Sequence, residues 1–332
     1  MDALDPERFY LRDPATVAIG SKSTFLLCDA SARSVVTTDD PPALSRVLQL
    51  LSAPIAGRDL LSAVDGQAPG VRSAVEALLA DGMLREASTA ESLVAVRDRV
   101  FADNQGYCFQ PGPVRCGHLV LAMTGSVVAG LMAPIVLSLA YSRFHERLDL
   151  IVTESARSFV QPELFEYYGI RAWTDPFERR DGMTVPHIGL AKSADLIAVV
   201  PASARSISRI AAGECSDLLS LVAAATSAPI VVAPTMNTAM LDNPSVRRNI
   251  DQLRADGVYV MEPTIFFEAA ELIRGSAPGY GMAGAFWGGP AGLMRALAAV
   301  LDLHAAAPAV PAAATGSPVV PPLNLRSEYP GV

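Results

Sequence analysis

Up to about residue 85, the hydrophobic and polar positions predict a small unit with short strands followed by helices. The predicted strands are Thr16–Ile19, Thr24–Cys28 and Ser34–Thr38, and the predicted helices are Pro42–Leu51, Gly57–Val64 and Val71–Ala80. Asp81-Gly82 then supplies a helix stop and a turn. This order of elements predicts an α+β winged-helix-like domain at residues 1–85, followed by a connector at residues 86–116.

From Gly117 onwards, apolar segments alternate with segments of helical periodicity. The predicted strands are Leu119–Met123, Leu148–Val152, Leu196–Val200, Pro229–Ala233 and Val258–Met261. The predicted helices are Ala129–Tyr141, Pro162–Tyr168, Ile207–Ala212, Leu218–Ala224 and Pro244–Ala255. Because nearly continuous apolar strands separated by helices are typical of a parallel sheet, we predict an α/β fold at residues 117–303. The expected architecture is a Rossmann-like (flavodoxin-like) parallel sheet with helices on both faces.

Two segments bear on the boundaries of this domain. Leu119–Tyr141 carries no charge, and its length would suit a membrane span. Its Gly125-Ser126 turn and Pro134 favour a buried strand and helix instead, so we expect no membrane insertion. Residues 304–332 are rich in alanine and proline, and this composition predicts a disordered or extended tail.

Composition narrows the functional classes. The 332 residues carry a net charge of −8, which disfavours a general nucleic-acid binder. The four cysteines have neither the paired spacing of a zinc site nor the density of a secreted disulfide scaffold, so no metal is expected. The acidic, polar N-terminus is unlike a secretory signal. A cytoplasmic protein with reduced thiols is the resulting expectation.

Small polar residues follow three successive strands of the predicted sheet. The first strand is followed by Gly125 and Ser126, and the second by Thr153 and Ser155. The third is followed by Pro201, Ala202 and Ser203, and then by Arg205 and Ser206. In parallel sheets the ligand lies beyond the carboxyl ends of the strands, and helix N-termini there suit a phosphate. Tight turns and helix caps are the alternative interpretations of the first two groups. Their shared edge favours one phosphate-bearing ligand.

Two further residues are candidates for chemistry. His187 precedes the third strand and has the side chain most suited to proton transfer near neutral pH, although a structural histidine is the alternative. Asn237 follows the fourth strand between Met236 and Met240. It would anchor a planar polar group between apolar walls, or else form an Asx-turn into the next helix.

These blocks stand in a familiar order between Gly117 and Pro263. G-S, T-x-S-A-x-x-F, P-H-I-x-L-A-x-x-A-D, P-A-S-A, A-G-x-x-x-D-L-L and A-P-x-M-N-x-x-M follow one another. This order resembles the flavin-dependent cysteine decarboxylase family, which includes phosphopantothenoylcysteine decarboxylase and the peptidyl-cysteine decarboxylases of lanthipeptide, linaridin and thioamitide pathways. The resemblance implies a flavin, FMN or alternatively FAD, and a homo-oligomer such as a trimer or an assembly of trimers.

The resemblance also implies roles for individual residues. Gly125, Ser126, Thr153 and Ser155 match positions that hold the flavin phosphate or ribityl chain, and Pro201, Ala202 and Ser203 match the flavin loop. His187 matches the active-site histidine, and Asn237 matches the amide that holds the substrate, with Met240 closing that motif. The chain departs from the family at Arg205-Ser206, where Asn-Thr is usual, and at Leu241, where an aromatic residue is frequent.

The expected reaction is the oxidative decarboxylation of a C-terminal peptidyl cysteine to an aminoenethiol. The coenzyme A branch of the family uses a cysteine in a glycine-rich loop after the sheet, and the matching residues 274–282 contain none. Gly279 and Tyr280 of this loop are expected to contact the substrate, since its glycines allow closure. Two alternatives remain open: a phosphopantothenoylcysteine decarboxylase-like enzyme of coenzyme A synthesis, and a non-catalytic flavin-binding regulatory subunit.

The N-terminal unit resembles PqqD-like modules, which bind the leaders of precursor peptides. An exposed strand edge would let such a leader add as a further strand. The implied partner is therefore a precursor peptide, bound by its leader and by its C-terminal cysteine. Oligomer contacts or DNA binding are the alternative uses of a winged helix, and the acidic residues of the unit disfavour DNA.

Overall fold

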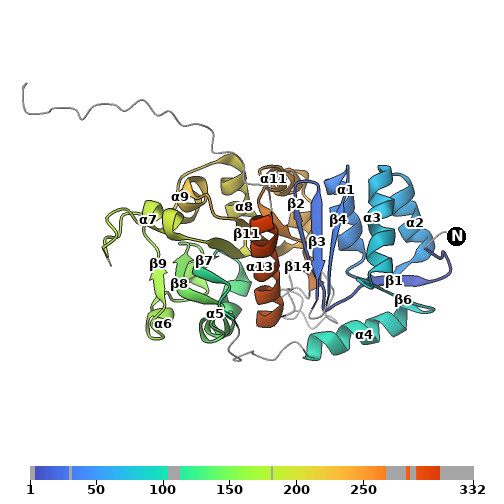
Figure 1. Ribbon diagram of the computed structural model, residues 1–332, viewed down its shortest axis with the longest axis horizontal. Coiled ribbons are helices and arrows are strands. Elements are labelled where there is room, and N and C mark those ends of the chain that lie inside the picture. The colour runs from blue at the N-terminus through green and yellow to red at the C-terminus, as the bar shows by residue number, and fades with distance from the viewer. Residues whose placement is uncertain are drawn as a thin grey trace, which may run out of the picture.

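A twisted, mainly parallel sheet forms the centre of the computed structural model (Figure 1). The structure describes residues 4–29, 32–103, 113–180, 182–266, 282–284 and 289–306. The parallel strands are β7 (Cys116–Met123), β8 (His145–Val152), β9 (Arg171–Trp173), β10 (Leu196–Ala202), β11 (Ile230–Asn237) and β12 (Tyr259–Met261). Their spatial order is β12-β11-β10-β7-β8-β9, with parallel pairing throughout. The predicted α/β class is confirmed.

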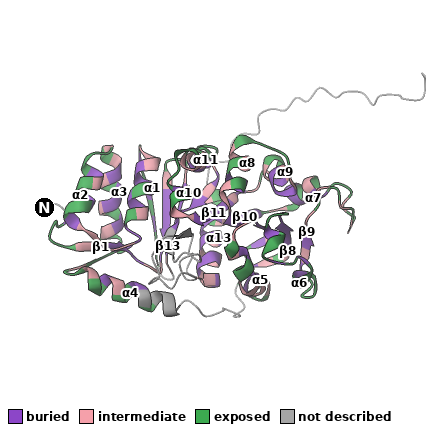
Figure 2. Cartoon of the chain, turned by 180° about the vertical axis from the view of Figure 1, so that it is seen from behind, coloured by how far each residue is buried: buried purple, intermediate pink, exposed green. Residues whose placement is uncertain are grey.

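Helices cover both faces of this sheet, as predicted. One face packs against α5 (Met132–Tyr141), α6 (Glu163–Glu166) and α13 (Gly289–Ala306). The other face packs against α7 (Pro186–Ser193), α8 (Ala204–Ala212), α9 (Leu218–Ala225), α10 (Thr238–Leu241) and α11 (Pro244–Ala255). The strands between them are apolar on both sides and fully buried in their central parts, which Figure 2 shows as a purple layer.

The N-terminal strands extend the same sheet. β2 (Val17–Ser21), β3 (Thr24–Cys28) and β4 (Arg33–Thr37) form an antiparallel meander, and β2 pairs with β12 through Met261↔Ile19 and Val260↔Gly20. Val17, Ile19 and Leu26 point into the core beneath α13, which also contains the central strands. The N-terminal region therefore shares a sheet and a hydrophobic core with the rest of the chain, and β4 is its outer edge strand.

A second core lies on the other face of this meander. It is formed by Phe25 and Leu27 together with α1 (Pro41–Leu50), α2 (Gly57–Asp65) and α3 (Pro69–Ala80). A small antiparallel sheet of β5 (Ile55–Ala56), β1 (Phe9–Arg12) and β6 (Leu84–Ala87) borders it, and α4 (Ala90–Asp103) packs on β1 and β6 (Figure 1). Strands and helices thus follow the predicted order, with β1 and β5 in addition, and β6 starts at the β-wing expected from Met83-Leu84.

Several short elements were not predicted from the sequence. β9 is one of them, and so are η1 (Val127–Leu131) and η2 (Ala156–Ser158), two 3-10 turns that follow β7 and β8. β13 (Thr264–Phe266) and β14 (Met282–Gly284) pair with each other, and β14 also pairs with the end of β11. α13 continues to Ala306, past the expected start of the tail at residue 304. Within the described ranges, no helix has the length and apolar character needed to cross a membrane.

A buried ionic cluster joins the amino ends of β7, β8 and β9. The carboxylate of Asp149, which is 0% exposed, lies 2.7 Å from His118 Nε2 and 2.8 Å from Arg171 Nε. Arg147 Nη2 lies 2.6 Å away, and Trp173 Nε1 donates a hydrogen bond of 3.2 Å. Because each partner comes from one of the three strands, this carboxylate fixes the edge of the sheet opposite the strand-end loops.

Candidate functional site

The strand order of the sheet reverses between β7 and β10, and we call the space beyond the carboxyl ends of these two strands the crevice. From β7 the chain crosses to β8 and β9 on one side, whereas β10, β11 and β12 lie on the other side. Such a reversal of strand order opens a crevice between the two flanking loops, where ligands of open α/β sheets bind. The loops after β7, β8 and β10 carry the predicted phosphate-binding residues, so the fold brings those three groups to one edge.

Thr124 connects the two loops that border the crevice. It is fully buried, and its Oγ1 donates to the carbonyl oxygen of Pro201 at 2.8 Å. The same hydroxyl accepts the N–H of Ser203 at 2.7 Å, while the Thr124 N–H donates to Pro201 O at 3.2 Å. Thr124 is not among the site residues expected from the sequence. Its position directly after a buried strand could have identified it, because the other candidate hydroxyls also follow strands.

Gly125 makes a close approach to the loop after β8. A Cβ atom added to Gly125 would lie 2.6 Å from both Cβ and Oγ of Ser155. Thr153 supports the same contact, since its N–H and its hydroxyl both donate to Met123 O, at 3.1 and 3.2 Å. The glycine is therefore needed for the packing of the two loops, and not only for the turn itself.

We expect Gly125→Ala to lower the free energy of unfolding by ~1–3 kcal/mol, as overpacking does, and to weaken the binding of any ligand at this crevice. Adding Ser155→Gly removes the two atoms that the new methyl group would meet, so the double variant should recover most of the stability. Urea unfolding of the wild type, the two single variants and the double variant measures the loss of stability and its recovery. Equal stability of Gly125→Ala and wild type would show that the loops are free to separate.

The hydroxyls around the crevice differ in how they are used. Ser126 and Ser155 begin the turns η1 and η2, yet neither side chain makes a capping hydrogen bond, and Ser126 is half-buried. Ser203 caps α8, with its Oγ accepting the N–H of Ser206 at 3.4 Å. Pro201, Ala202 and Ser206 are buried, whereas Arg205 is exposed on the first turn of α8. Ser126 and Ser155 are therefore the residues with hydroxyls best placed to meet a ligand.

Asn237 lies one strand further along the same edge. Its Oδ1 accepts the N–H of Ala239 at 2.7 Å, so the side chain caps α10 in the manner of an Asx-turn. Met236 is buried in the core, but Met240 is 49% exposed. β14 pairs with the end of β11, with Asn237 opposite Met282. Of the two methionines expected to form apolar walls beside Asn237, only Met236 is thus buried within the described residues.

His187 is the second residue of α7, the helix that leads into β10. Its Nδ1 atom is buried and lacks a hydrogen-bond partner. In the described parts of the chain, no hydrogen bond or ion pair joins His187 to Asn237 or to the strand-end loops. The structure therefore leaves the imidazole available for another group, without bringing it onto the other candidates. The remaining predicted substrate residues, Gly279 and Tyr280, lie outside the described residues.

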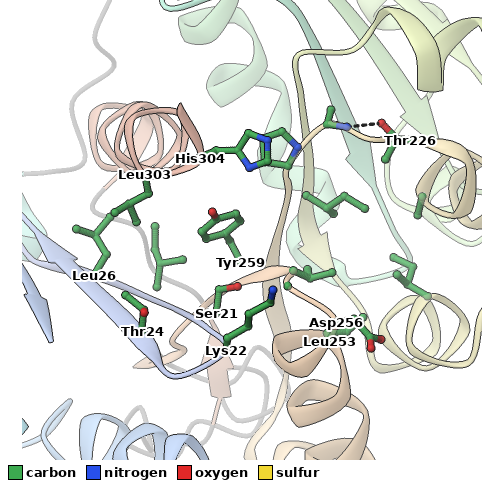
Figure 3. A pocket seen from close by; sticks show the side chains of 18 of the residues that line it. Ser21, Lys22, Thr24, Leu26, Thr226, Leu253, Asp256, Tyr259, Leu303 and His304 are labelled. Atoms are coloured by element: carbon green, nitrogen blue, oxygen red, sulfur yellow. Dashed lines mark hydrogen bonds between the residues drawn. The ribbon is translucent and has the colours of Figure 1, made fainter. Parts of the chain in front are cut away.

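A cavity of about 700 Å³ lies at the opposite, amino edge of the sheet. It is bounded by the β2–β3 hairpin, the starts of β11 and β12, and the end of α13, and Figure 3 shows Lys22, Tyr259 and His304 around it. None of the predicted site residues lines this cavity. Elsewhere among the described residues, no group of three or more His, Cys, Asp or Glu side chains is placed to hold a metal ion.

Known proteins similar to this chain include coenzyme A biosynthesis proteins. The Coenzyme A biosynthesis bifunctional protein CoaBC of Bacillus subtilis (strain 168) is 40% identical over 118 residues, which are 35% of this chain and 29% of the relative. CoaBC of Mycobacterium tuberculosis (strain ATCC 25618 / H37Rv) is 35% identical over 147 residues, which are 44% of this chain and 34% of the relative. The chain thus spans about a third of the length of these curated relatives.

Two similar solved structures each cover 57% of the chain. The FMN-dependent cysteine decarboxylase SpaF is 28% identical with a TM-score of 0.47, over 57% of this chain and 98% of that one. A mutant of PPC decarboxylase complexed with pantothenoylaminoethenethiol is 26% identical with a TM-score of 0.48, over 57% of this chain and 100% of that one. The Flavoprotein family matches residues 111–281, just over half of the 332 residues and the whole run of strand-end loops from Gly125 to Asn237. The chain belongs to the Flavoprotein family.

Proposed function

We propose that the chain is a flavin-dependent cysteine decarboxylase that binds FMN, or alternatively FAD, at the carboxyl ends of β7, β8 and β10. The observation that carries this proposal is the close packing of three polar strand-end loops at the point where the strand order reverses. Family membership supports the flavin as the ligand. The cysteine decarboxylase activity rests on the order of the sequence blocks around these loops.

The residues at the crevice fit the phosphate and ribityl part of a flavin. Ser126 and Ser155 offer hydroxyls that make no capping bond, and Gly125 keeps the space between them free of a side chain. α8 begins at this edge directly after Ser203, and the partial positive charge of a helix start favours a phosphate. Arg205, on the first turn of α8, is exposed.

The reaction would remove two hydrogens and carbon dioxide from a cysteine with a free carboxylate, leaving an enethiol. When bound, the flavin supplies the acceptor for the two electrons. Asn237 would hold the carboxylate at the end of β11 until carbon dioxide leaves. His187 would take the thiol proton, since its buried Nδ1 has no partner to compete with a substrate.

We expect His187→Gln to lose at least ~10²-fold in turnover, the low end for a positioned acid–base group, while the flavin stays bound. The pH dependence of the residual rate should differ from that of the wild type, because the proposed base is missing. Steady-state assays across pH 5.5–8.5, a window of about this width around the ordinary histidine pKa, measure both. An unchanged pH profile with near wild-type turnover would make His187 a structural residue.

Two substrates remain in competition. The curated relatives are coenzyme A biosynthesis proteins, which supports a phosphopantothenoylcysteine-type substrate more strongly than a peptide. The absence of cysteine from residues 274–282 favours the peptidyl branch, which leaves its product as the enethiol.

A precursor peptide could also bind at the edge of β4, where a leader strand could add by main-chain hydrogen bonds. A homo-oligomer, with the flavin between subunits, belongs to the same proposal.

Mass spectrometry of products decides between these readings. The purified protein, loaded with FMN, is incubated separately with a cysteine-ended peptide and with phosphopantothenoylcysteine. Loss of carbon dioxide plus two hydrogens from the peptide supports the peptidyl reaction, and loss of carbon dioxide alone from the second compound supports the coenzyme A alternative. No mass change in either, with FMN bound, would favour a non-catalytic flavin-binding subunit. A chain that cannot be loaded with FMN or FAD would overturn the whole proposal.

A further inference from the structure

Arg12 is a buried cation without a bonding partner. It ends β1 in the N-terminal region, and only 3% of the residue is exposed. Neither Nη1 nor Nη2 has a hydrogen-bond partner, and no ion pair to Arg12 is formed within the described residues. Since a guanidinium offers five N–H donors and keeps its charge, this is an unusual state for a side chain in a protein interior.

Arg12 belongs to the small sheet β5-β1-β6, but it lies near the carboxyl end of β12, because the carboxylate of Glu262, which directly follows β12, acts electrostatically on its guanidinium. Its backbone N–H donates to Leu51 O at the end of α1, at 2.6 Å. β2 runs antiparallel to β12, so β2 begins beside the carboxyl end of β12, where the Glu262 N–H donates to Ala18 O at 2.7 Å. β12 is the neighbour of β11, whose carboxyl end carries Asn237. Arg12 therefore lies near this edge, although it belongs to the N-terminal region.

Glu262 is the carboxylate that acts electrostatically on Arg12, but it is already engaged. Its Oε1 accepts from Arg254 Nη2 at 2.6 Å, and its Oε2 accepts from Ser45 Oγ at 2.7 Å. Arg254 and Glu262 are themselves 3% exposed, so they form a closed pair in the interior. The carboxylate attracts Arg12 without a hydrogen bond or ion pair to it, and the Nη1 and Nη2 donors of the guanidinium remain unused.

Burial without a bonded partner is costly for a charge. Burial lowers the pKa of Arg12 to about 10, against the smaller opposite effect of Glu262. The group nevertheless stays charged at neutral pH, because its pKa still lies well above 7. A charge held in the interior with idle donors is better explained by a ligand that completes it than by a contribution to folding.

We propose that the Arg12 guanidinium binds an oxyanion of the substrate, a carboxylate or a phosphate, at the carboxyl edge of the sheet. This assignment rests on the proposed function and adds to it a residue from outside the Flavoprotein match. A planar guanidinium binds both kinds of oxyanion through two parallel N–H···O bonds. The N-terminal region would then take part in substrate binding directly, through the side chain that β1 presents to the edge beside β12.

The first test measures anion binding without turnover. Full-length protein loaded with FMN, so that the cofactor phosphate position is filled, is titrated with inorganic phosphate, with acetate and with chloride at equal ionic strength. We expect phosphate or acetate to raise the midpoint of thermal unfolding of the wild type above the chloride value. Arg12→Met, which removes the charge at similar length, should abolish that rise and should be no less stable than wild type in chloride.

Arg85→Gln is the matched control. The Arg85 side chain is 58% exposed and pairs with Asp13, the neighbour of Arg12, so it shares the location without the burial. It should keep the full response to the anion. An equal rise in Arg12→Met and wild type overturns the proposal, as does a wild type that responds to neither oxyanion.

The second test identifies the anion. Two N-acylated cysteines, one with and one without a terminal phosphate, are assayed for decarboxylation by wild type and Arg12→Lys. Loss of a bidentate contact should raise KM at least ~30-fold with little change in kcat, the size expected when a buried hydrogen-bonded charge pair is broken. A rise for both substrates identifies the carboxylate, and a rise for the phosphorylated one alone identifies the phosphate. An unchanged KM for both substrates overturns the proposal. If the wild type itself shows no turnover, the decarboxylase function is rejected, and the anion titration alone decides whether Arg12 binds an oxyanion.

Discussion

Asn237→Asp is expected to retain the fold and the flavin but to lose at least ~10²-fold in kcat/KM, the size found when a donor to a reacting oxyanion is removed. The capping bond survives, because an aspartate oxygen accepts the Ala239 N–H as the amide oxygen does at 2.7 Å. The amide NH₂ is replaced by a second oxygen with negative charge, which repels a substrate carboxylate. Steady-state assays and urea unfolding separate the two consequences.

Asn243 provides the control for this change. It caps α11 by the same geometry, with Oδ1 accepting the Ser245 N–H at 2.9 Å, and it is exposed. Asn243→Asp should leave both turnover and stability close to wild type. If Asn237→Asp behaves in the same way, Asn237 is only a helix cap. Asn237→Ala should lose ~1 kcal/mol of stability in addition, because it removes the cap as well.

The long apolar strands could be predicted because their signal is local. β7, β8, β10 and β11 each bury a continuous run of apolar residues, and Pro244–Ala255 has the expected bounds because Asn243 and Pro244 mark its start. β9 has only three residues, Arg171–Trp173, and its buried position depends on pairing with β8 and on the Trp173 hydrogen bond to Asp149. No local pattern reports such a contact.

The pairing of β2 with β12 is the main feature of the fold that the sequence does not reveal. A hairpin edge satisfies its backbone groups equally well with solvent, with a peptide or with another strand, so the partner depends on contacts distant in the chain. Here Ile19 lies opposite Met261, and α13 covers both strands. The edge available for a further strand is accordingly β4 and not β2.

The candidate site was predictable to the extent that its residues follow strands. Gly125, Thr153 and Ser203 could be placed at one edge because parallel strands bring their carboxyl ends together. Thr124 gains its role only when Pro201 and Ser203 come within 2.8 and 2.7 Å of its hydroxyl. Arg12 lies about a hundred residues before β7 in the chain, so only the tertiary fold reveals that Glu262, at the carboxyl end of β12, acts on its guanidinium.

Asp149→Asn is expected to destabilise the protein by about 3 kcal/mol near neutral pH, the low end for breaking a buried ion pair. The change replaces one carboxylate oxygen of residue 149 by an NH₂ group, so Arg147 and Arg171 lose their negatively charged partner. The low end applies because these arginine side chains are 33% and 32% exposed and can turn partly to solvent. Urea unfolding monitored by Trp fluorescence measures the difference, since Trp173 belongs to the cluster.

The same difference should depend on pH in a defined direction. Burial alone would raise the pKa of Asp149, but hydrogen bonds from His118 and Trp173, together with Arg147 and Arg171, hold the pKa below its ordinary value. A depressed carboxyl pKa stabilises the fold above the pKa of the unfolded chain, about 3.9, and this contribution is lost as the pH falls through the lower, folded value. The part of the gap between wild type and Asp149→Asn that comes from the Asp149 charge should therefore be present at pH values well above 3.9, roughly the unfolded value, and the gap should shrink in stronger acid.

Asp195→Asn is the control, because Asp195 also contacts His118 but from an exposed position. Its Oδ2 accepts the His118 backbone N–H at 2.8 Å, and the residue lies at the start of β10 near the same edge. An asparagine oxygen can accept that bond, so the loss should stay below ~1 kcal/mol, as for exposed polar contacts. Equal losses for the two variants, or a gap for Asp149→Asn that persists unchanged in acid, would mean that the fold does not depend on the charge of Asp149. The amino ends of β7, β8 and β9 would then be held by packing around Trp173 rather than by the carboxylate.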